Sequence, residues 1–180
     1  MRILKEQAAG LVIDIQERLF PFIHENEILT RNAGILINGL QVLGIPVLIT
    51  EQYTKGLGPT IQPLKQLFGE SKPIEKLAFS CCDDAAFMQH LDSLHRKFII
   101  ITGIESHVCV LQTTIDLLER NYIPVVVEDC VSSRRLNDKA MAVYRMRRMG
   151  AIITTYESVL FELLRYSGTD EFKAISKLVK

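Results

Sequence analysis

The sequence has no excess of either charge and no long hydrophobic run. Its 180 residues include 21 Lys and Arg against 21 Asp and Glu, a formal net charge of zero. A surface that binds nucleic acid usually needs an excess of basic residues, so we expect no nucleic-acid partner. No stretch approaches the roughly 20 apolar residues of a membrane span, and the first residues lack an apolar run of secretory length. We therefore expect no membrane partner either.

Cysteine is scarce and lacks metal-site spacing. The four cysteines, Cys81, Cys82, Cys109 and Cys130, form no CxxC pair and have no histidines at zinc-site spacing. Cys81 and Cys82 are poor disulfide partners for each other, because adjacent side chains point apart in regular structure. Reduced thiols in a cytoplasmic enzyme are the simplest interpretation.

Short apolar segments alternate with segments of helical period. Strands or extended segments are expected at 10–15, 46–50, 73–80, 97–103, 123–129 and 151–155. Helices are expected at 27–44, 58–68, 83–95, within 102–120, and at 136–150, 156–166 and 170–179. Strands separated by single helices are typical of βαβ units, and near-continuous apolar strands fit a sheet buried on both faces. Residues 1–180 are therefore predicted to form one domain, a doubly wound three-layer αβα sandwich.

Three reactive side chains lie where the strands of such a sheet end. Asp14 ends the first predicted strand, Lys76 lies in the third, and Cys109 follows the fourth. Because reacting groups in these folds cluster at the carboxyl ends of the strands, the three are expected at one edge. A buried aspartate needs a partner, and an ammonium would stabilise both a carboxylate and a thiolate.

The position of Cys109 predicts a reactive thiol. Ser106 is the expected N-cap, which would place Cys109 in the first turn, where the helix dipole lowers the pKa of a thiol. Amides of the same turn could receive an oxyanion. Spacing alone also allows a structural thiol, a turn-capping Asp14 and a solvated Lys76. His107 would not face Cys109 on a helix, so no Cys–His dyad is expected.

Five segments then identify a family resemblance. They are, in chain order, LVIDIQERLF, PVLITEQYTKGLGPT, EKLAFS, ITGIESHVCVLQTTIDLLERNYIPVVVEDCVSS and GAIITT. With Asp14, Lys76 and Cys109 they resemble the isochorismatase-like cysteine hydrolase superfamily, and especially its isochorismatase domain-containing subgroup. The resemblance implies a Rossmann-like six-stranded parallel sheet of order 3-2-1-4-5-6 and a catalytic Asp14–Lys76–Cys109 triad. It also implies a cis peptide between Ile104 and Glu105, and an oxyanion hole formed by the backbone N–H groups of Glu105 and Cys109.

The resemblance further implies hydrolysis of a carbon–nitrogen bond in a small molecule. Asp14 would accept the proton of Cys109, and the thiolate would form a thioester that water then hydrolyses. Nicotinamidases of the superfamily carry Asp-x-His after the second strand, where this chain has Glu51-Gln52-Tyr53. Neither a metal nor another cofactor is therefore expected. Isochorismatases proper act on a vinyl ether without the cysteine, so Cys109 favours an amide or carbamoyl substrate.

Several further expectations concern the pocket and the partners. The side chains expected to line the substrate pocket are Phe20, Tyr53, Phe79 and Ile104. The resemblance implies a homo-oligomer, a dimer or tetramer. The apolar region 152–156 and the later helices are candidates for the contact, with core packing as the alternative. Two other functions stay open: a non-catalytic binding or assembly protein with a vestigial triad, and a redox sensor that pairs Cys81 or Cys82 with Cys109. An activated Cys109 would be alkylated well below about pH 8.5.

Overall fold

Six parallel strands form a single sheet in the computed structural model, which describes residues 1–180. The strands are β1 (Ala8–Ile13), β2 (Val47–Gln52), β3 (Ile74–Lys76), β4 (Phe98–Ile104), β5 (Ile123–Ser132) and β6 (Ile152–Thr154). Their order is β3-β2-β1-β4-β5-β6, which confirms the predicted topology. Every neighbouring pair is parallel, so all six carboxyl ends lie at one edge.

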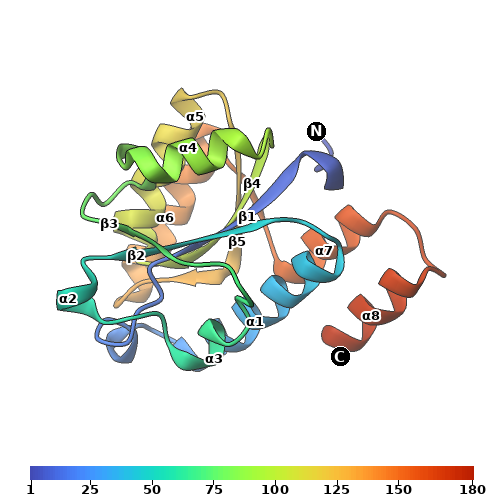
Figure 1. Cartoon of the computed structure of the whole chain (residues 1–180), viewed down its shortest axis with the longest axis horizontal. Coiled ribbons are helices and arrows are strands. Elements are labelled where there is room, and N and C mark those ends of the chain that lie inside the picture. Colours follow the sequence, from blue (N-terminus) through green and yellow to red (C-terminus); the bar gives the residue numbers. More distant parts are fainter.

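Helices cover both faces of the sheet (Figure 1). One face carries α4 (Ala85–Ser93), α5 (Leu111–Glu119) and α6 (Leu136–Met149). The other carries α1 (Asn26–Val42), α7 (Tyr156–Leu164) and α8 (Asp170–Leu178). Two one-turn helices, α2 (Thr54–Leu57) and α3 (Gln62–Lys65), lie between β2 and β3. No helix combines the length and apolarity that a membrane crossing requires.

The central strands are buried on both faces, with side chains alternating between the two. Leu11 and Ile13 of β1 pack with α4, α5 and α6, whereas Val12 packs on the opposite face with α1. All residues of β1 and β4 are buried. The alternation explains why these strands are near-continuous apolar runs in the sequence.

Local sequence also explains where several helices begin and end. Asp84 accepts a hydrogen bond from Phe87 N at 2.9 Å and caps the start of α4. Gly150 follows α6 with a φ of 106°, a conformation that favours glycine at the end of a helix. Such end signals are local, so these boundaries lie close to the predicted ones.

Three predicted segments differ in the structure. Instead of one helix at 58–68, α2 ends at Leu57 and α3 begins at Gln62, because Gly58 has a φ of 75° and interrupts the helical backbone. Of the extended segment 73–80 only Ile74–Lys76 pairs with β2, at the edge of the sheet. β5 continues to Ser132, because its pairing with β4 resumes at Val131 and Ser132 after a register shift that follows Val126.

The region 152–156 is not a free apolar surface. Ile152 and Tyr156 pack against the core formed with α1, α7 and α8. Both residues are only partly buried, so a contact between subunits in this region stays a prediction.

Candidate active site

Asp14 and Lys76 meet at the carboxyl edge of the sheet. Asp14 directly follows β1 with a φ of 53°, and Lys76 is the last residue of β3. Across the intervening β2, Lys76 Nζ lies 2.6 Å from Asp14 Oδ2, and the two side chains are 0% and 1% exposed. The predicted neighbours thus form a buried ion pair, and the alternative of a solvated Lys76 is wrong.

The ammonium of Lys76 has no free N–H group. It donates to Asp14 Oδ2 at 2.6 Å and to the carbonyl oxygens of Ala78 and Phe79, both at 3.1 Å. An ammonium has three donors, so all are in use. Burial by itself lowers the pKa of Lys76, but the negative charge of Asp14 opposes it, as do the sulfurs of Cys81 and Cys109 when they ionise, and the net pKa is raised. Lys76 is therefore a fixed positive charge.

The second oxygen of Asp14 is held by a hydroxyl group. Thr50 Oγ1 donates to Asp14 Oδ1 at 2.8 Å and lies 3.7 Å from the sulfur of Cys81. Because Thr50 gives its single proton to Asp14, Cys81 is the donor in the sulfur contact. Burial raises the pKa of Cys81 to about 12, so its thiol keeps that proton at neutral pH. Asp14 is thus oriented from both sides.

Cys109 lies beside this pair, in the π-helical turn Ser106–Val110 that precedes α5. Its thiol donates to Gln52 Oε1 at 3.1 Å, and the residue is 5% exposed. The charges of Asp14 and Lys76 both act on this sulfur, in opposite directions. The fold thus brings Asp14, Lys76 and Cys109 together from three separate strand ends.

The expected low pKa of Cys109 is wrong for the resting chain. Burial and the Asp14 carboxylate raise the pKa of the thiol, and the lowering effect of Lys76 is smaller. Ser106 is the first residue of the turn and not its cap, and its hydroxyl is buried without a hydrogen-bond partner. Because removal from water disfavours the thiolate, Cys109 rests as a neutral thiol. Rapid alkylation well below about pH 8.5 is therefore no longer expected.

The chain before the turn contains the Ile104–Glu105 peptide bond, which is cis. The Glu105 N–H donates no hydrogen bond within the chain, whereas its carboxylate accepts one from Arg134 Nε at 2.9 Å. The Glu105 side chain is therefore committed to Arg134. His107 contacts Ser133 Oγ through Nδ1 at 3.0 Å, which accounts for it without a role beside Cys109.

The chain is similar to known proteins over nearly its whole length. A profile of the isochorismatase domain matches residues 8–158. The chain belongs to the isochorismatase family. Isochorismatase family protein 1B of Dictyostelium discoideum is 38% identical over 184 residues, with 99% of this chain and 89% of the relative covered. The predicted family is therefore confirmed.

Two solved structures share the isochorismatase-family fold closely. MAR1 ribonuclease from Caenorhabditis elegans has a TM-score of 0.93 and 39% identity, covering 99% of this chain and 92% of that one. YcaC from Pseudomonas aeruginosa, solved with hexane-2,5-diol and covalent acrylamide, has a TM-score of 0.92 and 26% identity. The match covers 98% of this chain and 91% of the YcaC chain.

The residues expected to line the pocket divide into two groups. Tyr53 and Phe79 are each 52% exposed, and Tyr53 borders a hollow that Lys76 also lines. Phe20 is half-buried against the core beneath α1, and Ile104 is fully buried in that core. Ile104 was expected in the pocket of this isochorismatase-family chain, and that expectation is wrong because its side chain packs inward from β4.

The side chains from Lys76 to Ser80 are partly buried at the site and partly exposed on the surface. Lys76 and Ser80 are buried, whereas Leu77 and Phe79 are 75% and 52% exposed. β3 ends at Lys76, and the bend over residues 77–80 turns the side chains of Leu77 and Phe79 outward. The segment therefore supplies both the buried ammonium and an exposed apolar rim.

Sequence reasoning missed Gln52 and Gln16 as members of this isochorismatase-family site. The buried Gln16 carboxamide accepts from Gln52 N at 2.8 Å and donates to Gln52 O at 3.0 Å and to Gly58 O at 2.7 Å. The period of a strand gives one signal: Thr50 and Gln52 share a face at the carboxyl end of β2. Glu51 points the other way and accepts from Thr60 N and Oγ1, both at 2.7 Å.

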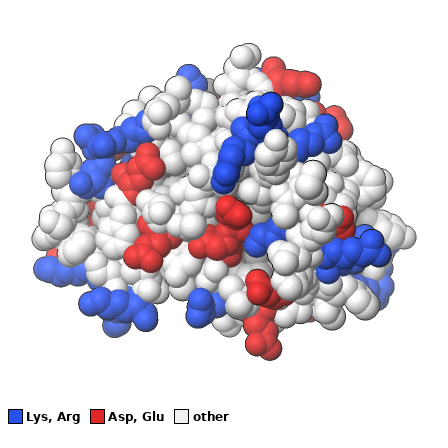
Figure 2. All heavy atoms as spheres, turned by 180° about the vertical axis from the view of Figure 1, so that it is seen from behind, with Lys and Arg blue, Asp and Glu red and all other residues white.

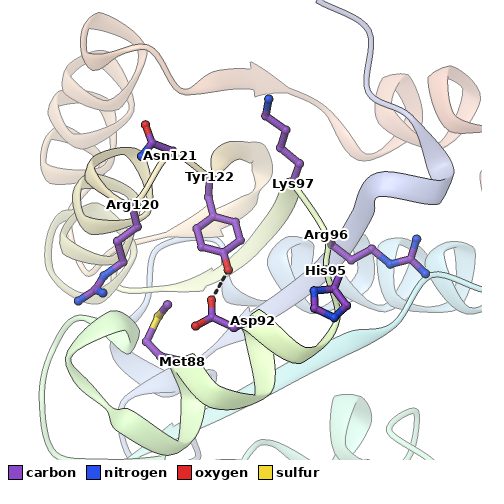
Figure 3. A pocket seen from close by; sticks show the side chains of 8 residues that line it. All are labelled: Met88, Asp92, His95, Arg96, Lys97, Arg120, Asn121 and Tyr122. Carbon is purple, nitrogen blue, oxygen red and sulfur yellow. Dashed lines mark hydrogen bonds between the residues drawn. The ribbon is translucent and has the colours of Figure 1, made fainter.

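A second hollow lies at the opposite edge of the sheet, where β4 and β5 begin (Figure 3). Its lining includes several basic side chains, and Tyr122 donates a hydrogen bond to Asp92. The charged ends of Arg96, Lys97 and Arg120 point away from one another in this view. The hollow therefore offers no convergent group of charges, in contrast to the buried Asp14–Lys76 pair at the carboxyl edge.

Proposed function

We propose that this protein is a metal-independent cysteine hydrolase that cleaves a carbon–nitrogen bond of a small amide-like or carbamoyl-like molecule. Membership in the isochorismatase family supports a hydrolase. The observation that carries the proposal is the buried Asp14–Lys76 pair beside the thiol of Cys109. A buried ion pair contributes little net stability compared with hydrocarbon of the same volume, so its presence at this edge favours a chemical role.

The first half of the reaction forms a thioester. Asp14 accepts the proton of the neutral Cys109 thiol, and Lys76 holds the aspartate in place while the thiolate attacks the carbonyl carbon. The oxygen that becomes negative is stabilised by the N–H groups of Glu105 and Cys109. The unpaired Glu105 N–H supports this assignment.

The second half of the reaction returns the enzyme to its starting state. The protonated Asp14 gives its proton to the leaving nitrogen, and the carbon–nitrogen bond breaks. Asp14 then takes a proton from water as the water oxygen attacks the thioester. The carbon–sulfur bond breaks, the carboxylic or carbamic acid is released, and Asp14 returns the proton to the Cys109 sulfur. The raised pKa of Cys109 fits this sequence, because the thiol keeps its proton until a substrate carbonyl can accept the sulfur.

The surface favours a small molecule over a nucleic acid. Figure 2 shows basic and acidic side chains interspersed among uncharged ones on the face that it presents. A polyanion would require a continuous basic region. Because a relative is named a ribonuclease, RNA cleavage is the alternative that the experiment must also address. The cytoplasmic location stays a prediction.

The test is a panel of small primary amides, ureas and carbamates, with a single-stranded RNA oligonucleotide as the competing substrate. The expected result is turnover of at least one small compound by the parent protein, an acyl adduct on Cys109 by mass spectrometry, and no turnover by Cys109→Ala. Cys130→Ala is the matched control, because Cys130 is also buried but packs on the other face of the sheet. Full turnover by Cys109→Ala, or cleavage of the RNA alone, would refute the proposal.

The number of subunits is a separate prediction that the family resemblance supports. Light scattering after gel filtration should give two or four times the chain mass of 20.4 kDa. A monomer at micromolar concentration would contradict it, without affecting the proposed chemistry.

A further inference from the structure

The side chain of Gln52 faces the sulfur of Cys109 in a fixed orientation. Its Oε1 accepts the thiol proton at 3.1 Å, and its Nε2 donates to Leu77 O at 3.4 Å. Rotation of the carboxamide by half a turn would place its oxygen against the carbonyl oxygen of Leu77, which is unfavourable because neither group can donate. The oxygen of the carboxamide therefore points at the nucleophile.

The backbone of Gln52 is also fixed. Gln16 is fully buried and binds both the N–H and the carbonyl oxygen of Gln52, and it ties the same point to Gly58. Gln52 itself is half-buried at the end of β2, so its side chain can reach a molecule that enters from solvent. A positioned acceptor next to a reactive group is the usual form of a recognition element in a small-molecule site.

The first step of the proposed reaction removes the partner of this acceptor. When Asp14 takes the proton of Cys109, Gln52 Oε1 is left beside a negatively charged sulfur with no donor. A partly buried acceptor without a donor is costly, so the reaction proceeds best if another donor replaces the thiol. The leaving nitrogen of a substrate is in the right region, because Asp14, which must protonate it, also borders the sulfur.

We infer that Gln52 recognises the leaving nitrogen of the substrate and makes the enzyme favour substrates whose leaving nitrogen carries hydrogen. This inference rests on the proposed function. Primary and secondary amides, ureas and N-unsubstituted carbamates satisfy the condition, whereas esters and tertiary amides do not. One N–H of the leaving group binds Gln52 Oε1, and the new N–H comes from Asp14 when the carbon–nitrogen bond breaks. Gln52 neither gains nor loses a proton.

The experiment compares an amide with an ester of the same acyl group. Propionamide and methyl propionate, and benzamide and methyl benzoate, are incubated with the parent protein, Gln52→Met, Gln52→Glu and Cys109→Ala. The released acid is measured by NMR. Gln52→Met keeps the length of the side chain and removes the acceptor. Gln66→Met is the control, because Gln66 is exposed and its side chain makes no hydrogen bond.

The expected result is a selective loss. Gln52→Met should lower kcat/KM for the amides by about 5- to 15-fold, the effect of one hydrogen bond, and change the esters by less than about twofold. Gln52→Glu keeps an acceptor, so it should keep the parent's ratio of amide to ester rates even if both rates fall. Gln66→Met should match the parent.

Two other results would have separate meanings. Equal loss of amide and ester turnover in Gln52→Met, with Cys109-dependent turnover intact in the parent, would overturn the role of Gln52 and leave the proposed function standing. Turnover of these compounds by Cys109→Ala at the parent's rate would overturn the cysteine hydrolase itself. Circular dichroism of each variant separates a folding defect from either result, and Gln52→Glu then supplies the comparison if Gln52→Met does not fold.

Discussion

Replacement of Lys76 by an uncharged residue should lower the free energy of unfolding more than replacement of a surface lysine does. In Lys76→Met the Asp14 carboxylate stays buried and retains only the hydrogen bond from Thr50. The carbonyl groups of Ala78 and Phe79 also lose their donor. The variant therefore contains an uncompensated buried charge, which is the costly way to break an ion pair.

The structure allows an estimate of the size of this effect. At 2.6 Å and an effective dielectric constant of about 20, the attraction between the two charges is about 6 kcal/mol before desolvation is subtracted. Loss of one partner from a buried pair typically costs about 3–5 kcal/mol. We therefore expect the free energy of unfolding to fall by about 4 kcal/mol, a large part of the about 5–15 kcal/mol of an ordinary domain.

Urea denaturation at pH 7, followed by circular dichroism, measures this difference. With a slope of about 2 kcal/mol per molar urea, the midpoint should fall by about 2 M. Lys65→Met, at an exposed lysine, should change the free energy of unfolding by less than about 0.5 kcal/mol. The double variant Lys76→Met with Asp14→Asn removes both charges and should recover at least half of the loss. A midpoint shift below about 0.5 M, or no recovery in the double variant, would refute the reasoning.

Three further predictions follow from the same site and its sheet. Asp14→Asn should abolish turnover yet speed the alkylation of Cys109 by iodoacetamide at about pH 8, because the carboxylate raises the pKa of the thiol; slower alkylation would contradict this. The pKa of Lys76 is raised, so the contribution of its ion pair to stability is complete below about pH 10.4 and is lost as the pH rises through the higher folded pKa. The difference in urea midpoint between the parent and Lys76→Met should therefore shrink at more alkaline pH, and a constant difference up to about pH 12 would contradict the sign. Gly103→Ala should cost more than about 2 kcal/mol by thermal unfolding, since Gly103 has a φ of 150° and its Cβ would lie 2.4 Å from a β1 carbonyl oxygen; Gly69→Ala, with open space around it, should cost about 1 kcal/mol.

The sheet could be predicted from sequence because its signals are local. β4 is an apolar run interrupted only by Thr102 and ending in glycine and isoleucine, and both faces of the strand are buried as such a run requires. Helix starts such as Asp84 before α4 are marked by a capping residue. The prediction of one helix at 58–68 is wrong. The apolar spacing of the segment is helical, but Gly58 and the contacts of Thr60 with Glu51 keep the backbone non-helical before α3.

The arrangement of the site could be predicted only in part. The ends of parallel strands placed Asp14, Lys76 and Cys109 at one edge, and the fold brings them together. The protonation state of Cys109 depends on burial by segments distant in sequence, and the helix-dipole argument contains no term for that burial. Gln52 contacts the sulfur across 57 positions of sequence, so its role becomes visible only once the strand ends are in place.

Residues 76–80 combine buried and exposed groups, which has a consequence for engineering the substrate preference of this protein. The carbonyl groups of Ala78 and Phe79 bind the Lys76 ammonium, whereas the side chains of Leu77 and Phe79 are exposed and contribute little to the packing of the core. Substitutions of Leu77 and Phe79 would alter which molecules bind at this surface and would leave the buried Asp14–Lys76 pair unchanged. A library varied at Leu77, Phe79 and Tyr53 should thus yield folded proteins at high frequency, with preferences that diverge from one member to the next.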